Sequence, residues 1–158
     1  MAGGPPVSTV FNISELKAQL PRGKRLLGLD IGSKTIGLAL SDTTLTIATP
    51  METIKRKKFK EDVAHLLAIV TQQGVGGYVL GWPVNMDGSE GPRCQSTRAF
   101  SDNLAKVSGL PQLFWDERLS TAAVERTLIE ADRSRARRKE LVDKMAAGYI
   151  LQGALHAL

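Results

Sequence analysis

The chain has 158 residues, 42% of them hydrophobic and 23% charged, which fits one folded domain and excludes a disordered polar chain. No apolar run approaches the roughly 18 residues that cross a bilayer. The first residues lack the basic start and apolar core of a signal peptide, and a single cysteine, Cys94, excludes an internal disulfide framework. We therefore expect a cytoplasmic protein of one domain that does not contact a membrane.

The net charge of +5 is unevenly distributed along the chain. Residues 55–60 and 133–139 each hold five basic side chains and no acidic one, so the remainder has 11 basic and 16 acidic residues, a net charge of −5. Two concentrated basic stretches favour nucleic acid as a partner, because neutralising phosphates releases counterions. The alternative is a pair of solvated loops or helix ends. The candidate phosphate contacts in these stretches are Lys55, Arg56, Lys57, Lys58, Arg135, Arg137 and Arg138.

The predicted elements begin with a short helix, which Asn12 and Glu15 cap and Pro21 ends. Residues 25–31 are apolar on both faces, as in a strand inside a covered sheet, and they form a hairpin with a strand over 36–41. The later predicted elements are a strand over 44–49 before Pro50, a helix over 61–73, a strand over 77–82, a polar loop over 83–92, a helix over 96–107, a strand over 112–116, a helix from Ser120 or Thr121 to about Ala131, and a final helix with Val142, Met145, Ala146, Tyr149 and Ile150 on one stripe.

Consecutive strands followed by alternating helices and strands predict an α/β fold, a mixed sheet flanked by helices in a single domain. We expect residues 1–20 to form an N-terminal extension, a tail plus the short helix, and residues 21–158 to form the domain itself.

Acidic residues in three predicted elements are candidates for chemistry. Asp30 ends a strand of Leu, Gly and Ile, where a carboxylate is costly to bury unless it is paired or bound to a cation. Asp116 and Glu117 end the strand over 112–116, and strand alternation lets at most one of them face Asp30. Asp143 lies in the final helix, beside its apolar stripe. The structural alternatives are a turn cap, an exposed acidic turn and a solvated helix flank.

Carboxylates without His or Cys suit a hard cation, Mg²⁺ or Mn²⁺, better than zinc. Together with two basic stretches, they are typical of the two-metal arrangement of nucleases. The loop over 81–92, with its glycines and Asn85, has a composition that can bring backbone amides close to a phosphate, and a plain long turn is the alternative.

Four blocks of sequence resemble motifs of the YqgF (RuvX) family. Residues 26–42 read Leu-Leu-Gly-Leu-Asp-Ile-Gly-Ser-Lys-Thr-Ile-Gly-Leu-Ala-Leu-Ser-Asp, and residues 81–91 resemble the Gly-x-Pro-x-Asn-Met-Asp-Gly loop. Residues 115–121 match Asp-Glu-Arg-Leu-Ser/Thr, and residues 142–147 match the C-terminal helix, with all four in order at the spacing of the family. Thr35 stands where the family often has Arg, and Trp82 where it often has Leu.

The resemblance implies an RNase H-like fold, related to Holliday-junction resolvases, and a metal-dependent nuclease. It also implies maturation of the 5′ end of pre-16S rRNA, in the cytoplasm. By the match, Asp30, Glu117 and Asp143 correspond to the catalytic metal ligands, with Glu117 preferred to Asp116, and they would hold two Mg²⁺ or Mn²⁺ ions. We add three nucleic-acid contacts to those in the basic stretches, namely Lys34, Asn85 and Arg118.

Three other functions compete with this interpretation. The same fold and ions suit resolution of branched DNA, and the basic stretches alone suit a non-catalytic RNA-binding factor in ribosome assembly. Asp30-x-Gly32 followed by Gly37 also resembles the first phosphate motif of actin-type and sugar-kinase ATPases, but those need two lobes and this chain has residues for one. The protein is expected to act as a monomer or a homodimer.

Overall fold

The computed structural model describes the backbone of residues 12–85, 87–119 and 135–158, and side chains in the last range from Met145 onward. The elements are α1 (Ile13–Gln19), β1 (Arg25–Ile31), β2 (Thr35–Ser41), β3 (Ala48–Lys55), α2 (Phe59–Gln73), β4 (Val75–Trp82), α3 (Pro92–Val107), β5 (Gln112–Asp116), the 3-10 turn η1 (Glu117–Leu119) and α5 (Arg135–Ala157). The helix predicted between Ser120 and Ala131 lies outside the described residues.

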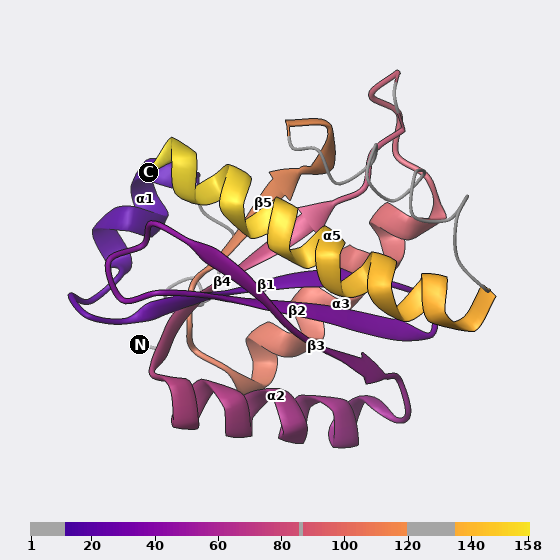
Figure 1. Cartoon of the computed structure of the whole chain (residues 1–158), viewed down its shortest axis with the longest axis horizontal. Helices are drawn as coiled ribbons and strands as arrows, with labels where there is room; N and C mark the ends of the chain where they lie inside the picture. Colours follow the sequence, from indigo (N-terminus) through magenta and orange to yellow (C-terminus); the bar gives the residue numbers. More distant parts are fainter. Residues whose placement is uncertain (1–11, 86, 120–134) are drawn as a thin grey trace.

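The five strands form one mixed sheet in the order β3-β2-β1-β4-β5 (Figure 1). β2 pairs antiparallel with β1 and with β3, whereas β1, β4 and β5 are parallel neighbours. The mixed sheet predicted from the element order is therefore confirmed. Because β1, β4 and β5 run in the same direction, their carboxyl ends meet at one edge of the sheet, where open α/β sheets bind ligands.

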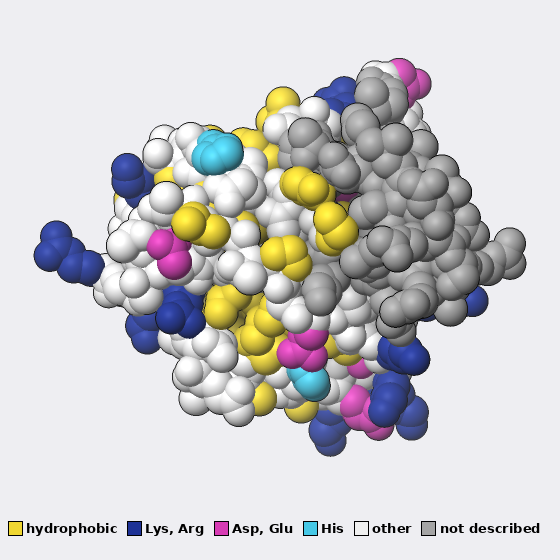
Figure 2. Space-filling view, in the orientation of Figure 1, with side chains coloured by type: hydrophobic (Ala, Val, Ile, Leu, Met, Phe, Trp, Pro, Cys, Tyr) yellow, Lys and Arg dark blue, Asp and Glu magenta, His cyan; other side chains and the backbone are white. Residues whose placement is uncertain are grey.

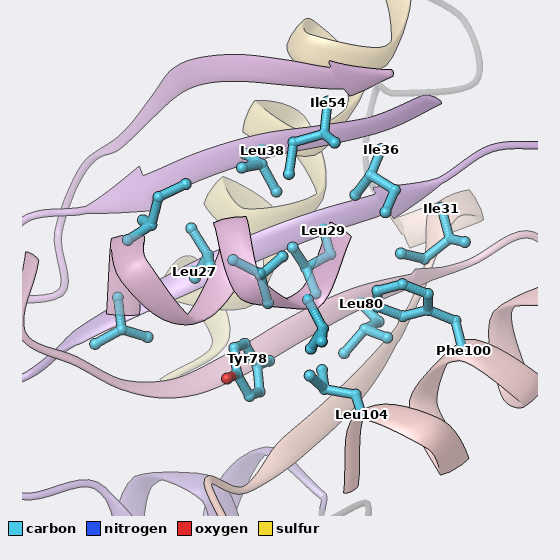
Figure 3. Close-up of a cluster of buried hydrophobic side chains, with 14 residues drawn as sticks. Leu27, Leu29, Ile31, Ile36, Leu38, Ile54, Tyr78, Leu80, Phe100 and Leu104 are labelled. Carbon is cyan, nitrogen blue, oxygen red and sulfur yellow. The ribbon is translucent and has the colours of Figure 1, made fainter. Parts of the chain in front are cut away.

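The sheet is buried on both faces, which explains why β1 has no polar face. α5 crosses one face, while α2 and α3 cover the other (Figure 1). Leu27 and Leu29 pack in the core with α2 and α3, which Figure 3 shows in close-up. Leu26 packs on the opposite face with residues of α5. Gly28 also lies beside α5. A Cβ added to this glycine would lie 2.8 Å from Cβ of Leu151, so α5 approaches the strand closely here.

The third strand is displaced from its predicted position. The sequence predicts it over 44–49, before Pro50, but β3 runs from Ala48 to Lys55 through that proline. β3 is an edge strand, and its register shifts where Pro50 pairs with Ala39, so the missing N–H interrupts no central ladder. The residues before it form a turn in which the Asp42 carboxylate accepts hydrogen bonds from the Thr44 hydroxyl and from the backbone of residues 46 and 47.

Helix starts follow local rules. Asn12 Oδ1 accepts from the Glu15 backbone N–H at 2.8 Å, so Asn12 caps the helix as predicted. Glu15 Oε1 accepts from the Asn12 side-chain amide at 2.7 Å, in place of the backbone N–H of a full capping box. α3 begins at Pro92, four residues before the predicted start, because proline suits the first position of a helix. Among the described helices, none combines the length and hydrophobicity that a membrane crossing requires.

Candidate active site

Two buried carboxylates lie at the shared carboxyl edge of the sheet. Asp30, the penultimate residue of β1, is 1% exposed, and Glu117, the first residue after β5, is 3% exposed. β4 lies between these two strands, and its Gly81 has no side chain to separate them. A Cβ on Gly81 would lie 3.3 Å from Cγ of Glu117 and 2.4 Å from Cδ1 of Ile150. The glycine therefore leaves the space that the Glu117 side chain uses.

One arginine connects the two acids. Arg93 Nη2 donates to Asp30 Oδ1 at 3.3 Å, and its Nη1 lies 3.9 Å from Glu117 Oε2. Arg93 comes from the first turn of α3, and its side chain is 45% exposed. Ionised, Asp30 and Glu117 carry one more charge than Arg93 neutralises. Sequence reasoning missed Arg93, because nothing local distinguishes it from Arg98 on the same helix.

Asp116, the neighbour of Glu117, makes a different pair. The Arg118 guanidinium donates to its carboxylate from Nε and Nη2, with a shortest distance of 2.7 Å, and the Arg118 backbone N–H donates at 2.9 Å. The hydrogen bonds from Arg118 hold the pKa of Asp116 below its ordinary value. Arg118, predicted as a nucleic-acid contact, is thus engaged with a carboxylate two residues away.

Asp143, the third predicted ligand, lies in α5, and its side chain is outside the described residues. Helical spacing puts position 143 one turn before Ala147, whose carbonyl oxygen faces Gly28 of β1. Farther along α5, Gln152 hydrogen-bonds Thr46 and Ala48 beside the other end of β1. The first turns of α5, which include position 143, therefore lie nearer the carboxyl end of β1 than its amino end.

The described donor set fits a hard divalent cation in part. Within the described side chains, no group of three or more His, Cys, Asp or Glu residues is close enough to hold a metal. Asp30 and Glu117 nevertheless supply buried carboxylate oxygens, the donors that Mg²⁺ and Mn²⁺ prefer, and Gly81 leaves room beside them.

Basic residues from two turns lie next to the site. The Arg56 backbone N–H donates to the Lys34 carbonyl at 2.8 Å, which brings the β1–β2 turn beside the segment after β3. Lys34, Lys55, Lys57 and Lys58 are exposed there. Arg56 is half-buried, since its Nη1 donates to the Gly32 carbonyl at 2.8 Å and its guanidinium lies 5.7 Å from the Phe100 ring centroid.

The remaining predicted nucleic-acid contacts are three arginines of α5 and Asn85. On the face that α5 covers, Lys and Arg side chains lie around the rim, and hydrophobic side chains gather nearer the middle (Figure 2). Arg135, Arg137 and Arg138 begin α5, and their side chains lie outside the described residues. Asn85 is exposed in the loop after β4, where its Nδ2 donates to Ser89 Oγ at 2.9 Å and its backbone N–H donates to the Ser89 carbonyl at 2.9 Å. Asn85 thus closes this loop on itself.

Comparison with known proteins relates the chain to one family. The RuvX family, described as "Holliday junction resolvase", matches residues 24–157. A protein of Paramagnetospirillum magneticum named "Putative pre-16S rRNA nuclease" is 67% identical over 142 residues, covering 90% of this chain and 92% of that protein. A protein of Rhodobacter capsulatus with the same name is 60% identical over 146 residues, covering 92% of each.

The structure is similar to that of T. thermophilus RuvC in complex with Holliday junction substrate. The TM-score is 0.54 at 13% identity, covering 85% of this chain and 94% of that one. At that identity the likeness bears on the fold alone, and it confirms the RuvC-like RNase H fold that the resemblance implied. Because the family match covers residues 24–157 and two relatives are 67% and 60% identical over 90% and 92% of the chain, this chain belongs to the RuvX family.

Proposed function

We propose that this protein is a metal-dependent nuclease that hydrolyses phosphodiester bonds at the 5′ end of pre-16S rRNA during ribosome biogenesis in the cytoplasm. The observation that carries the proposal is the convergence of two buried carboxylates, Asp30 and Glu117, on one cationic group at the carboxyl edge of the sheet. The names of the relatives support precursor rRNA as the substrate.

The roles follow from position. Asp30 and Glu117 would hold the divalent cations, and Asp143, on the part of α5 that runs towards Asp30, would complete the ligand set. Such ions supply activation of a water molecule and stabilisation of the leaving oxygen. Asp30 and Glu117 are both shielded from solvent, and Gly81 leaves the space that the Glu117 side chain uses.

The substrate backbone would be held by exposed lysines beside this edge, Lys34, Lys55, Lys57 and Lys58, and by the arginines of early α5, Arg135, Arg137 and Arg138. Arg56 would act mainly by holding the turn after Asp30, because it donates to the Gly32 carbonyl. Phosphate contacts of this kind make binding strongly salt-dependent. We assign the nuclease domain to residues 21–158 and the extension to residues 1–20, which the family match over 24–157 supports.

The second candidate is cleavage of branched DNA. The description of the family favours it, and carboxylates do not distinguish RNA from DNA. The test is cleavage of end-labelled pre-16S rRNA and a four-way DNA junction, side by side, with Mg²⁺, Mn²⁺ or EDTA. We expect rRNA cleavage with either metal and none with EDTA.

Two other results of that experiment would replace the proposal. Cleavage of the junction alone would assign the site to branched DNA. Tight rRNA binding without cleavage in any metal would assign the protein to the non-catalytic assembly factors.

A further inference from the structure

Arg93 occupies the position between the two candidate ligands. Its guanidinium contacts Asp30 at 3.3 Å and Glu117 at 3.9 Å, whereas the metal–oxygen distance for Mg²⁺ is about 2.1 Å. A cation bound by both carboxylates needs the space between them. The guanidinium and the metal therefore cannot both lie there in this arrangement.

The contacts of Arg93 are suited to exchange. Each carboxylate meets the guanidinium through one long contact, and the arginine side chain is 45% exposed, so solvent reaches the group without opening the fold. Arg118 is arranged in the opposite way. Its Nε and Nη2 both donate to the carboxylate of Asp116, with 2.7 Å between Nη2 and Oδ2. Because the cationic partner is accessible and its contacts are long, another cation can replace it at little cost, provided that the buried carboxylates stay paired.

The two acids nevertheless need a counter-charge when no metal is bound. Asp30 and Glu117 are almost completely buried, and leaving buried carboxylates without a cation is strongly unfavourable. Arg93 is the described basic side chain that contacts both.

We propose that Arg93 is the internal counter-cation of the metal-free site, and that a divalent cation binding to Asp30 and Glu117 displaces its guanidinium. The inference rests on the proposed function, since it takes these carboxylates as metal ligands. Arg93 stabilises the metal-free protein and opposes metal binding, so it sets the metal concentration at which the site fills.

The test is calorimetric titration of the full chain with Mn²⁺, without nucleic acid, for wild type and the Arg93→Gln and Arg93→Lys variants. Arg93→Gln should bind Mn²⁺ about threefold to tenfold more tightly, because a partly exposed competing charge is removed. Arg93→Lys keeps the charge without the fork and should fall between. The matched control is Arg98→Gln, on the same helix, where the guanidinium lies 5.1 Å from the Trp82 ring centroid; it should bind like wild type.

Thermal unfolding gives a second readout. In EDTA, Arg93→Gln should unfold at a lower temperature than wild type, and saturating Mn²⁺ should raise its midpoint by more. If Arg93→Gln does not fold in EDTA, recovery of its helical circular dichroism on adding Mn²⁺ supports the proposal. Failure of Mn²⁺ to restore the fold contradicts it.

Two outcomes separate this inference from the proposed function. Unchanged or weaker Mn²⁺ binding by Arg93→Gln, while Asp30→Asn loses binding, overturns the counter-cation role and leaves the metal site standing. Wild-type Mn²⁺ binding by Asp30→Asn, or no binding by the wild type, overturns the proposed function as well.

Discussion

Two acid–arginine clusters meet at the end of β5, where their acids Asp116 and Glu117 are adjacent, and the two clusters are built differently. Asp116 and Arg118 are two residues apart, partly exposed, and joined by several hydrogen bonds. Asp30 and Glu117 are buried, come from different strand ends, and share one arginine from a third element. The first pair forms within three consecutive residues, while the second brings two buried carboxylates from distant elements to the same guanidinium.

The difference shows how neighbouring acids acquire different roles. A local pair on the surface contributes little and needs no ligand. Buried acids that converge from distant elements suit a bound cation, since burial makes negative charge costly unless a cation pairs with it. We therefore place the chemistry at Asp30 and Glu117 and a structural role at Asp116.

Asp30→Asn tests the buried cluster most severely. The amide keeps the shape of the side chain but removes the charge that would hold a cation, so metal-dependent hydrolysis should be lost while the fold and substrate affinity stay nearly unchanged. Cleavage assays, circular dichroism and filter binding measure the three properties. A residual metal-dependent rate above a few per cent of wild type would contradict the assignment.

Glu117→Gln and Asp116→Asn compare adjacent residues directly. Glu117→Gln should remove most of the metal-dependent rate, because an amide cannot supply the anionic oxygen that a hard cation prefers, and Mn²⁺ should restore part of it. Asp116→Asn should cost little, because it breaks only the exposed pair with Arg118. The reverse result would mean that the site uses the other acid.

Gly81→Ala probes the space beside Glu117. The added Cβ meets Ile150 Cδ1 and Glu117 Cγ, so the free energy of unfolding should fall by about 1–3 kcal/mol and the cleavage rate should fall too. Adding Ile150→Val removes the first contact and not the second. The double variant should regain stability in urea unfolding but not the rate; recovery of both would show that Glu117 was not displaced.

The exposed pair predicts a small effect of pH. Arg118 lowers the pKa of Asp116 in the folded protein, so the pair stabilises the fold above the ordinary aspartate pKa and loses this contribution as pH falls through the lowered value. Arg118→Gln should raise the pKa of Asp116 towards its ordinary value and remove this part of the acid-side loss of stability. An NMR titration of the Asp116 carboxyl carbon measures the shift, and an unchanged pKa would contradict the pairing.

Much of the sheet could be predicted because its signals are local. Residues 25–31, apolar on both faces, predict β1, and the apolar residues just before Asp116 predict β5. Both strands carry an acidic residue near the carboxyl edge of the sheet. The extent of β3 could not be predicted, since whether Pro50 interrupts a strand depends on its place at the sheet edge and on its register with β2.

The site was predictable only where chain direction determines it. Parallel strands bring Asp30 and the Asp116–Glu117 pair to one edge, and alternation divides that pair between two sides. Arg93 and Asp30 are 63 positions apart in the sequence, so no local pattern predicts the hydrogen bond between them. The basic run predicts Arg56 as a phosphate contact, and that stays a prediction; the hydrogen bond from its guanidinium to the Gly32 carbonyl could not be predicted, because it joins residues 24 positions apart.

The most direct test of the central claim is anomalous diffraction from crystals of the full chain soaked in Mn²⁺. We expect a peak about 2.1 Å from carboxylate oxygens of both Asp30 and Glu117, with the Arg93 guanidinium moved away from both. A manganese peak elsewhere, or none between these carboxylates at saturating Mn²⁺, would contradict it.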